Sequence, residues 1–370
     1  MAPLLPLLLL LAILPPGRHF AAAAEPPRSP ATALFVLGDS TVGCAAPSSG
    51  GVLLMPPLND LISSNLTGTT PPLPLPCVAR RRLPDLLAER MGLPPPPPVS
   101  ALNGTVAAAA ARGVNFGGGA GFRAGAAVGQ QVRVAAETLQ LLRLEADDAD
   151  VGGGAVFVLA FGSDACARLL APGAAAAAPK HGRRGLARLL ADRVARGVAE
   201  LYEAGARRVA VLGVPPLGCA PRALWEAAPP AGAACVGEAN ELVQGYNARV
   251  AARLGELRAQ LPGADVVFCD VYEGVMDIVS DPGRYGLEEA REACCGLGPF
   301  RATVGCLSKA MACGRPERRV WWDLYSTTEA VDALVVTWAW RPPEPDSSST
   351  KSICSPISLQ QLAAAGAGGV

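Results

Sequence analysis

The chain has 370 residues, half of them hydrophobic, and its 32 Lys and Arg residues balance 32 Asp and Glu residues. That length allows one large domain or two small ones, with ample apolar side chains for a core. A balanced charge gives no electrostatic reason to expect nucleic acid or an anionic membrane surface as a partner, and we expect neither.

The N-terminus has the layout of a secretory signal. A leucine-rich run spans residues 4–14, and alanines at 21–24 follow it, which favours cleavage near Ala24. The run is interrupted by Pro6 and is too short to span a bilayer, and no later segment is long and apolar enough to do so. We therefore expect residues 1–24 to be removed, and the mature protein to be soluble and secreted.

Eleven cysteines indicate an oxidising compartment, and their odd number leaves a free thiol or an intermolecular bond. Their spacing does not match a metal site, so we expect disulfides, although sequence alone does not determine the pairing. The two pairs that we predict are Cys219–Cys235 and Cys306–Cys313. Glycosylation sequons at Asn65 and Asn103 add weak support for secretion.

The order of predicted elements favours an open α/β sheet. Segments with helical period, at residues 186–201 and 242–261, lie between short continuous apolar runs, and Ala204-Gly205 is a plausible end for the first helix. Continuous apolar runs are typical of parallel strands that are covered on both faces. The runs predicted as strands are 33–37, 155–161, 208–214 and 265–271, with a shorter fifth at 113–116.

Two parts of the chain are expected to decorate one domain at 25–340. Residues 53–111 are rich in proline and alanine, and we interpret them as an irregular surface excursion without assigned structure. Residues 341–370 form a polar C-terminal tail that ends in a short possible helix, ISLQQLAAA.

The stretch VLGDSTV carries the first candidate for chemistry. A predicted strand ends at Leu37, Gly38 permits a tight turn, and Ser40 would open the following helix at the active edge of the sheet. The structural alternative is that Asp39 and Ser40 are ordinary N-cap residues after a strand.

This stretch resembles the first block of the plant GDSL-type esterases and lipases, a branch of the SGNH hydrolases. Further blocks follow in the order of that family and cover nearly the whole mature chain. They are GVNFGGGAGF (113–122), FVLAFGSD (157–164), LYEAGARRVAVLGVPPLGCAPR (201–222), NELVQGYN (240–247), YGLEEAREACCGLGPF (285–300), WWDLYSTTEA (321–330) and CSPISLQQLA (354–363). The segment between the first two blocks, at 53–111, departs from the family.

The resemblance implies a fold and a reaction. The fold would be a three-layer α/β/α sandwich with a mostly parallel, flavodoxin-like central sheet. The reaction would be the hydrolysis of a small acyl ester or lipid ester, in the apoplast or cell wall. This chemistry requires neither a metal nor an organic cofactor.

The resemblance also implies a site. The serine of GDS is the nucleophile and falls on Ser40, and the oxyanion hole adds Gly119 and an asparagine of the third block. The base is a histidine three residues after an aspartate, which falls on Asp323. A serine hydroxyl needs a neighbour to take its proton, and the tetrahedral anion needs hydrogen-bond donors.

Two of these positions depart from the pattern. In the third block, at 162–165, either Asp164 replaces the asparagine or the asparagine has been deleted. An ionised aspartate cannot donate a hydrogen bond, and losing one oxyanion donor costs about 100- to 1,000-fold in turnover. In the fifth block, Ser326 occupies the histidine position and Thr327 the proline position. Serine is no base near neutral pH, which leaves Asp323 at most an acceptor for Ser326.

Three interpretations remain open. The first is a secreted GDSL-type esterase with impaired turnover through Ser40, for which His181 is a candidate substitute base. The second is a catalytically inactive protein that binds a lipid, an ester or a cell-wall component. The third is a decaying gene copy or a faulty gene model, which would also explain the irregular region at 53–111.

Overall fold

The computed structural model describes most of the chain from residue 30 onwards. The described residues are 30–43, 81–99, 112–118, 124–146, 154–171, 182–227, 234–342 and 351–364. The predicted signal peptide, Asn65, Asn103, Gly119 and His181 lie outside them. Within the described part, none of the helices is both long and apolar enough to cross a membrane.

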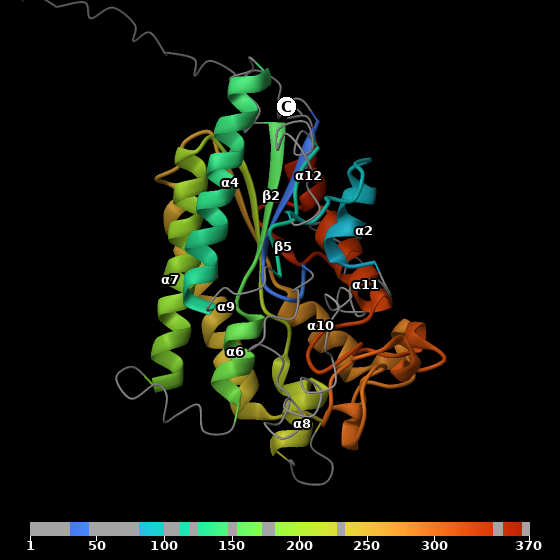
Figure 1. Cartoon of the computed structure of the whole chain (residues 1–370). Helices are drawn as coiled ribbons and strands as arrows, with labels where there is room; N and C mark the ends of the chain where they lie inside the picture. Colours follow the sequence, from blue (N-terminus) through green and yellow to red (C-terminus); the bar gives the residue numbers. More distant parts are fainter. Residues whose placement is uncertain are drawn as a thin grey trace, which may run out of the picture.

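A central sheet of five strands runs through the molecule (Figure 1). Its order is β1-β2-β3-β4-β5, and neighbouring strands are parallel except for the last pair. The four longer strands confirm the predicted runs, with small differences at their carboxyl ends. The strands are β1 (Ala33–Gly38), β2 (Ala155–Ala160), β3 (Arg208–Leu212), β4 (Asp265–Cys269) and β5 (Cys354–Ser355).

The predicted strand at residues 113–116 is reduced to extended chain beside β1. The N–H of Val36 donates to the carbonyl of Val114 at 2.9 Å, and the N–H of Phe116 donates to the carbonyl of Val36 at 2.7 Å. Val36 and Asn115 form an isolated parallel bridge. Residues 113–116, the second extended segment along the chain, therefore lie on one side of β1. The later strands lie on its other side, which is the flavodoxin-like order.

Helices cover both faces of the sheet (Figure 1), which confirms the three-layer α/β/α sandwich. The helices on one face are α4 (Ala124–Ala146), α6 (Ser163–Leu170), α7 (Gly182–Glu203) and α9 (Gly237–Arg258). Those on the other are α2 (Leu83–Arg90), α10 (Val271–Ser280), α11 (Glu329–Trp340) and α12 (Leu359–Ala363). Helix α8 (Pro221–Ala227) follows the 3-10 turn Leu217–Cys219.

Alternating strand residues feed the two cores, which explains why the strands are almost entirely apolar apart from Arg208 and Asp265, the first residues of β3 and β4. Phe35 and Phe157 point to the α7 side, where their rings stack with centroids 5.0 Å apart. Their neighbours Leu34 and Val156 are equally buried in the core on the α11 side. Parallel strands that are covered on both faces need apolar side chains at every position.

Helix α2 lies within the stretch 53–111, for which we predict no structure. Leu86, Leu87 and Ala88 of this helix are buried, and α2 packs against α11. Pro84 stands in its first turn, where the missing N–H costs no hydrogen bond. The helix is short, and the proline-rich residues around it hide its amphipathic pattern.

Part of the predicted C-terminal tail belongs to the folded core. Strand β5 pairs antiparallel with β4, and Cys354 forms a disulfide with Cys269. In α12, which confirms the predicted terminal helix, Leu359 and Leu362 are almost fully buried. Residues 351–364 therefore complete the sheet edge and one of its covering layers.

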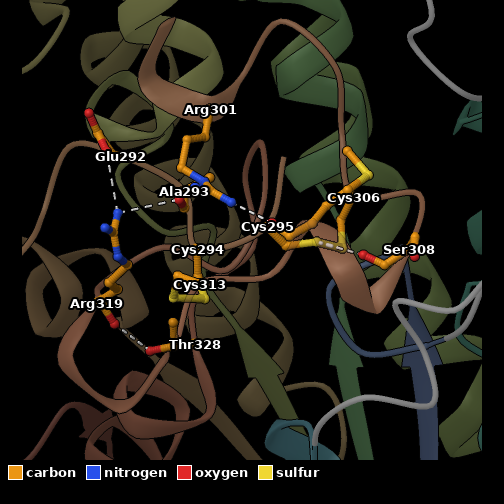
Figure 2. Close-up of a disulfide and its surroundings, with 11 residues drawn as sticks. Glu292, Ala293, Cys294, Cys295, Arg301, Cys306, Ser308, Cys313, Arg319 and Thr328 are labelled. Atoms are coloured by element: carbon orange, nitrogen blue, oxygen red, sulfur yellow. Dashed lines mark hydrogen bonds and ion pairs between the residues drawn. A yellow bond between two sulfur atoms is a disulfide. The ribbon is translucent and has the colours of Figure 1, made fainter. Parts of the chain in front are cut away.

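One predicted disulfide is confirmed and the other is wrong. Cys219 is bonded to Cys235 as predicted. Cys313 is bonded to Cys294, and Cys306 to Cys295 (Figure 2). The adjacent Cys294 and Cys295 therefore bind different partners, which their spacing along the chain does not reveal.

Candidate active site

The carboxyl ends of β1, β2 and β3 meet at one edge of the sheet, where ligands gather in open α/β folds. Beyond β1 the backbone passes very close to β2. The N–H of Asp39 donates to the carbonyl of Ala160 at 3.0 Å. A Cβ atom on Gly38 would lie 2.4 Å from that same carbonyl oxygen, so only glycine fits at this position.

Ser40 lies in a turn after β1, and the helix that we predict to begin there is not formed in the described residues. The N–H groups of Val42 and Gly43 donate to the carbonyl of Asp39, both at 3.3 Å. The Asp39 carboxylate accepts from the N–H and the hydroxyl of Thr41, at 3.2 and 2.7 Å. Such local carboxylate bonds stabilise a turn in competition with a helix.

Three polar side chains that sequence analysis missed hold this turn. Gln131 exchanges a pair of hydrogen bonds with the backbone of Gly38, both at 2.8 Å. Arg82 donates to the carbonyls of Ser40 and Gly43 at 2.6 and 2.7 Å. Asn115 donates to the carbonyl of Val42 at 2.8 Å. Of the three, only Asn115 could have been found from the sequence, because it stands within the second family block.

Asp164, the second residue of α6, contacts Ser40 directly. The Ser40 hydroxyl donates to Oδ1 of Asp164 at 2.5 Å, and the Ser40 N–H donates to Oδ2 at 3.2 Å. The carboxylate engages both the hydroxyl and the N–H of Ser40.

The side chain of Asp39 links this turn to the start of α6. Its Oδ2 accepts from the N–H groups of Gly162 and Asp164, both at 3.1 Å. Burial, followed by the charge of Asp164, raises the pKa of Asp39 to about 7. Burial and the adjacent Asp164 thus both disfavour the charged form of the Asp39 carboxyl group.

A second glycine is required where β2 leads into α6. Gly162 has φ of 124°, a left-handed conformation, and a Cβ there would lie 2.6 Å from the ring of Tyr246. The Tyr246 hydroxyl donates to the carbonyl of Phe161 at 2.6 Å. Tyr246 of α9 thus holds the strand end that precedes Asp164.

Asp323 and Ser326 occupy a turn that precedes α11. Oδ1 of Asp323 accepts from the N–H groups of Tyr325 and Ser326, at 3.1 and 2.8 Å. Asp323 is therefore an acceptor for Ser326, through the backbone N–H. The Thr327 hydroxyl donates to Asp332 at 2.5 Å, and Thr328 caps α11.

The turn is held by a lobe at residues 282–318, which consists largely of short 3-10 turns. Two disulfides cross-link this lobe (Figure 2). The N–H groups of Cys294 and Cys295 donate to the carbonyls of Trp321 and Trp322, at 2.9 and 2.7 Å. Arg319, which precedes the turn, donates to the carbonyl of Ala293 at 3.4 Å (Figure 2). The lobe thus holds the chain on which Asp323 and Ser326 stand.

A small cavity of about 50 Å³ lies between this turn and the serine turn. Ser326, Tyr325 and Thr327 line it from one side, and Thr41 and Ser163, the neighbours of Ser40 and Asp164, line it from the other. Most of the remaining lining is apolar. Those residues include Val42, Leu83, Ala160, Phe161, Leu212, Val214, Val271 and Val335.

The serine turn at the edge of a flavodoxin-like sheet is the arrangement that the SGNH resemblance implies. The family model described as GDSL-like lipase/acylhydrolase matches residues 34–329. The chain therefore belongs to the GDSL-like lipase/acylhydrolase family. Ester hydrolysis is the function that this membership supports.

Relatives from Arabidopsis thaliana carry matching names. One GDSL esterase/lipase is 28% identical over 290 residues, which cover 75% of each chain. Another is 28% identical over 302 residues, which cover 75% of this chain and 76% of the relative. GDSL esterase/lipase EXL2 is 33% identical over 150 residues, which cover 40% of this chain and 39% of its own.

Proposed function

We propose that this protein is a secreted ester hydrolase that works through Ser40 and turns over slowly. The observation that carries the proposal is the engagement of the Ser40 hydroxyl by Asp164, at 2.5 Å, in place of an imidazole. Asp323 stands at the aspartate position of the family's sequence pattern, but its Oδ1 accepts hydrogen bonds from the backbone N–H groups of Tyr325 and Ser326. The nucleophile is thus held in position without the family's base.

The expected loss of rate follows from the two substitutions. A well-matched general base contributes about 100- to 10,000-fold, and one oxyanion donor contributes about 100- to 1,000-fold. Gly119, the proposed second oxyanion donor, lies outside the described residues. The N–H of Ser40, the other backbone donor, is bound to Asp164 at 3.2 Å and must be released before it can bind an oxyanion.

The cavity beside the serine turn supports a small acyl group as substrate. Its volume of about 50 Å³ has room for a group of a few non-hydrogen atoms. Its lining combines apolar side chains with the hydroxyls of Thr41, Ser163 and Ser326. A short-chain carboxylic ester satisfies both the size and the polarity of this lining.

The second candidate function is that of an inactive binding protein. It is favoured by the same contact, because a carboxylate that bonds both the hydroxyl and the N–H of Ser40 occupies the groups that would perform acyl transfer. Such a protein would bind an ester, a lipid or a cell-wall component without converting it.

The test is a comparison of the secreted full-length protein with its Ser40→Ala variant, on p-nitrophenyl acetate and a fluorophosphonate probe. We expect slow hydrolysis and slow labelling that both disappear in the variant. Turnover at the rates of ordinary esterases, about 10 per second, would contradict the slow-turnover proposal. Equal behaviour of the two proteins would leave the binding function as the explanation.

Secretion rests on the N-terminal segment and on the cysteines. The described residues include four disulfides, which persist in oxidising compartments. Expression of the full chain in plant cells, followed by N-terminal sequencing of protein in the apoplastic fluid, tests it. We expect a mature end near Glu25; retention of the intact chain inside the cell would be the contrary result.

A further inference from the structure

We propose that Asp164 is the base that accepts the proton of Ser40, so that a serine–aspartate pair carries out the residual acyl transfer. This inference rests on the proposed function, because it requires that esters react at Ser40. It assigns a catalytic role to a residue that the family pattern would class only as a lost oxyanion donor.

The geometry is that of a base holding its nucleophile. The hydroxyl of Ser40 has one proton to donate, and the structure directs it to Oδ1 of Asp164 at 2.5 Å. General-base catalysis requires hydrogen-bond reach between the two groups, and charge-assisted O–H···O⁻ bonds are short. The Asp323 turn holds its carboxylate on backbone N–H groups instead.

The carboxylate of Asp164 is also held in place. The backbone N–H of Asp164 donates to Asp39 at 3.1 Å, and the N–H of Ser40 donates to Oδ2 of Asp164 at 3.2 Å. The first bond holds the backbone of Asp164, and the second holds its carboxylate against the serine turn. A fixed acceptor needs little rearrangement when the proton is transferred.

The proposed steps balance without a co-reactant. The Oγ of Ser40 attacks the ester carbonyl carbon while its proton moves to Oδ1 of Asp164. The tetrahedral intermediate collapses, the alcohol leaves with that proton, and an acyl-serine remains. Asp164 then takes a proton from water, whose oxygen attacks the acyl carbon, and returns a proton to Oγ as the carboxylic acid departs.

The decisive experiment is the rate of fluorophosphonate labelling in the wild type and in Asp164→Asn. Asparagine has the same shape but cannot accept a proton, so we expect the Ser40-dependent rate to fall about tenfold or more. An unchanged or faster rate would overturn the proposal, because it would show that Asp164 only obstructs the oxyanion. Asp281→Asn, at an exposed aspartate outside the site, is the matched control and should label like the wild type.

Asp164→Asn in a Ser326→His variant separates two effects of residue 164, that of a base and that of a carboxylate in the oxyanion hole. Ser326→His adds an imidazole three residues after Asp323, at a position that lines the cavity. With that base present, Asp164→Asn should raise the rate, because the amide now supplies an oxyanion donor. The effect of Asp164→Asn therefore reverses its sign between the two backgrounds. The same sign in both would contradict the proposal.

A chemical rescue keeps the test independent of how Asp164→Asn folds. In Asp164→Ala, added formate supplies a carboxylate in the vacated space and should raise the labelling rate with increasing concentration. Formate should not affect Ser40→Ala. Absence of rescue would overturn the assignment of Asp164, whereas Ser40-dependent labelling of the wild type would still support the proposed function. A wild type without any Ser40-dependent labelling would overturn both.

Discussion

Asp39 is buried in an environment that differs strongly from that of a free side chain in water. It accepts hydrogen bonds from Thr41, Gly162 and Asp164, and it lies beside the carboxylate of Asp164. Desolvation disfavours its charged form more than these bonds favour it, so the pKa rises. Asp39 thus links the ends of β1 and β2 to the start of α6. The free energy that its burial costs depends on pH, because burial disfavours the charged form.

Protein stability should report this titration. The pKa of Asp39 is raised from 3.8 in the free side chain to about 7, so its contribution to stability is complete below the lower value and is lost as pH rises through the higher one. We expect the free energy of unfolding of the wild type to fall relative to Asp39→Asn between about pH 5 and about pH 7. The fall is at most about 1.4 kcal/mol per pH unit. Urea unfolding measures it, and parallel curves would contradict the prediction.

At the scale of elements, the cross-linked lobe determines where Asp323 and Ser326 lie. Short 3-10 turns, rather than longer helices, make up much of this lobe in the described chain. They are Pro282–Tyr285, Pro299–Arg301, Lys309–Met311 and Pro316–Arg318. Such turns bury little apolar surface, and the lobe depends on the disulfides Cys294–Cys313 and Cys295–Cys306.

Removal of one lobe disulfide should loosen the Asp323 turn. Cys294 and Cys313 are 19 residues apart, and we expect Cys294→Ala/Cys313→Ala to cost about 3 kcal/mol of stability. Hydrogen exchange of a peptide that spans 321–327 should become faster, because Trp321 accepts from Cys294.

The matched control is Cys219→Ala/Cys235→Ala, whose cysteines are 16 residues apart. It should lose a similar amount of stability while the exchange of 321–327 stays unchanged. Equal acceleration in both variants would show that exchange follows global stability rather than the lobe.

At the scale of the whole molecule, the C-terminal segment closes the fold. Strand β5 covers the edge of β4, and α12 fills the core on the α11 side. The N–H of Ala31, just before β1, donates to the carbonyl of Ala363 at 2.9 Å. The two ends of the described chain therefore support the same sheet.

The disulfide that ties this segment down should matter more than the shorter-range ones. Cys269 and Cys354 are 85 residues apart, so their bond restricts the unfolded chain most. We expect Cys269→Ala/Cys354→Ala to lower the unfolding free energy by about 4.5 kcal/mol. A loss no larger than that of Cys219→Ala/Cys235→Ala, measured by urea unfolding, would contradict this ranking.

The sequence alone determined the layers and most of the family pattern. The strands and helices α7 and α9 could be predicted because continuous apolar runs and a helical period are local properties of the chain. The same holds for Ser40 and Asp323, which stand in short recognisable blocks. Helix α2 was not predicted because its few buried residues, which include Leu86, Leu87 and Ala88, form too short a pattern among the many surrounding prolines.

Only the tertiary structure decided what surrounds Ser40. Ser40 and Asp164 are 124 residues apart, and they meet because β1 and β2 are neighbours in the sheet. The partners of the adjacent Cys294 and Cys295 likewise depend on how the lobe folds, because sequence spacing alone does not distinguish Cys306 from Cys313. Local patterns specify elements, whereas contacts between distant residues depend on how those elements pack, and the hydrogen bond from Ser40 to Asp164 is such a contact.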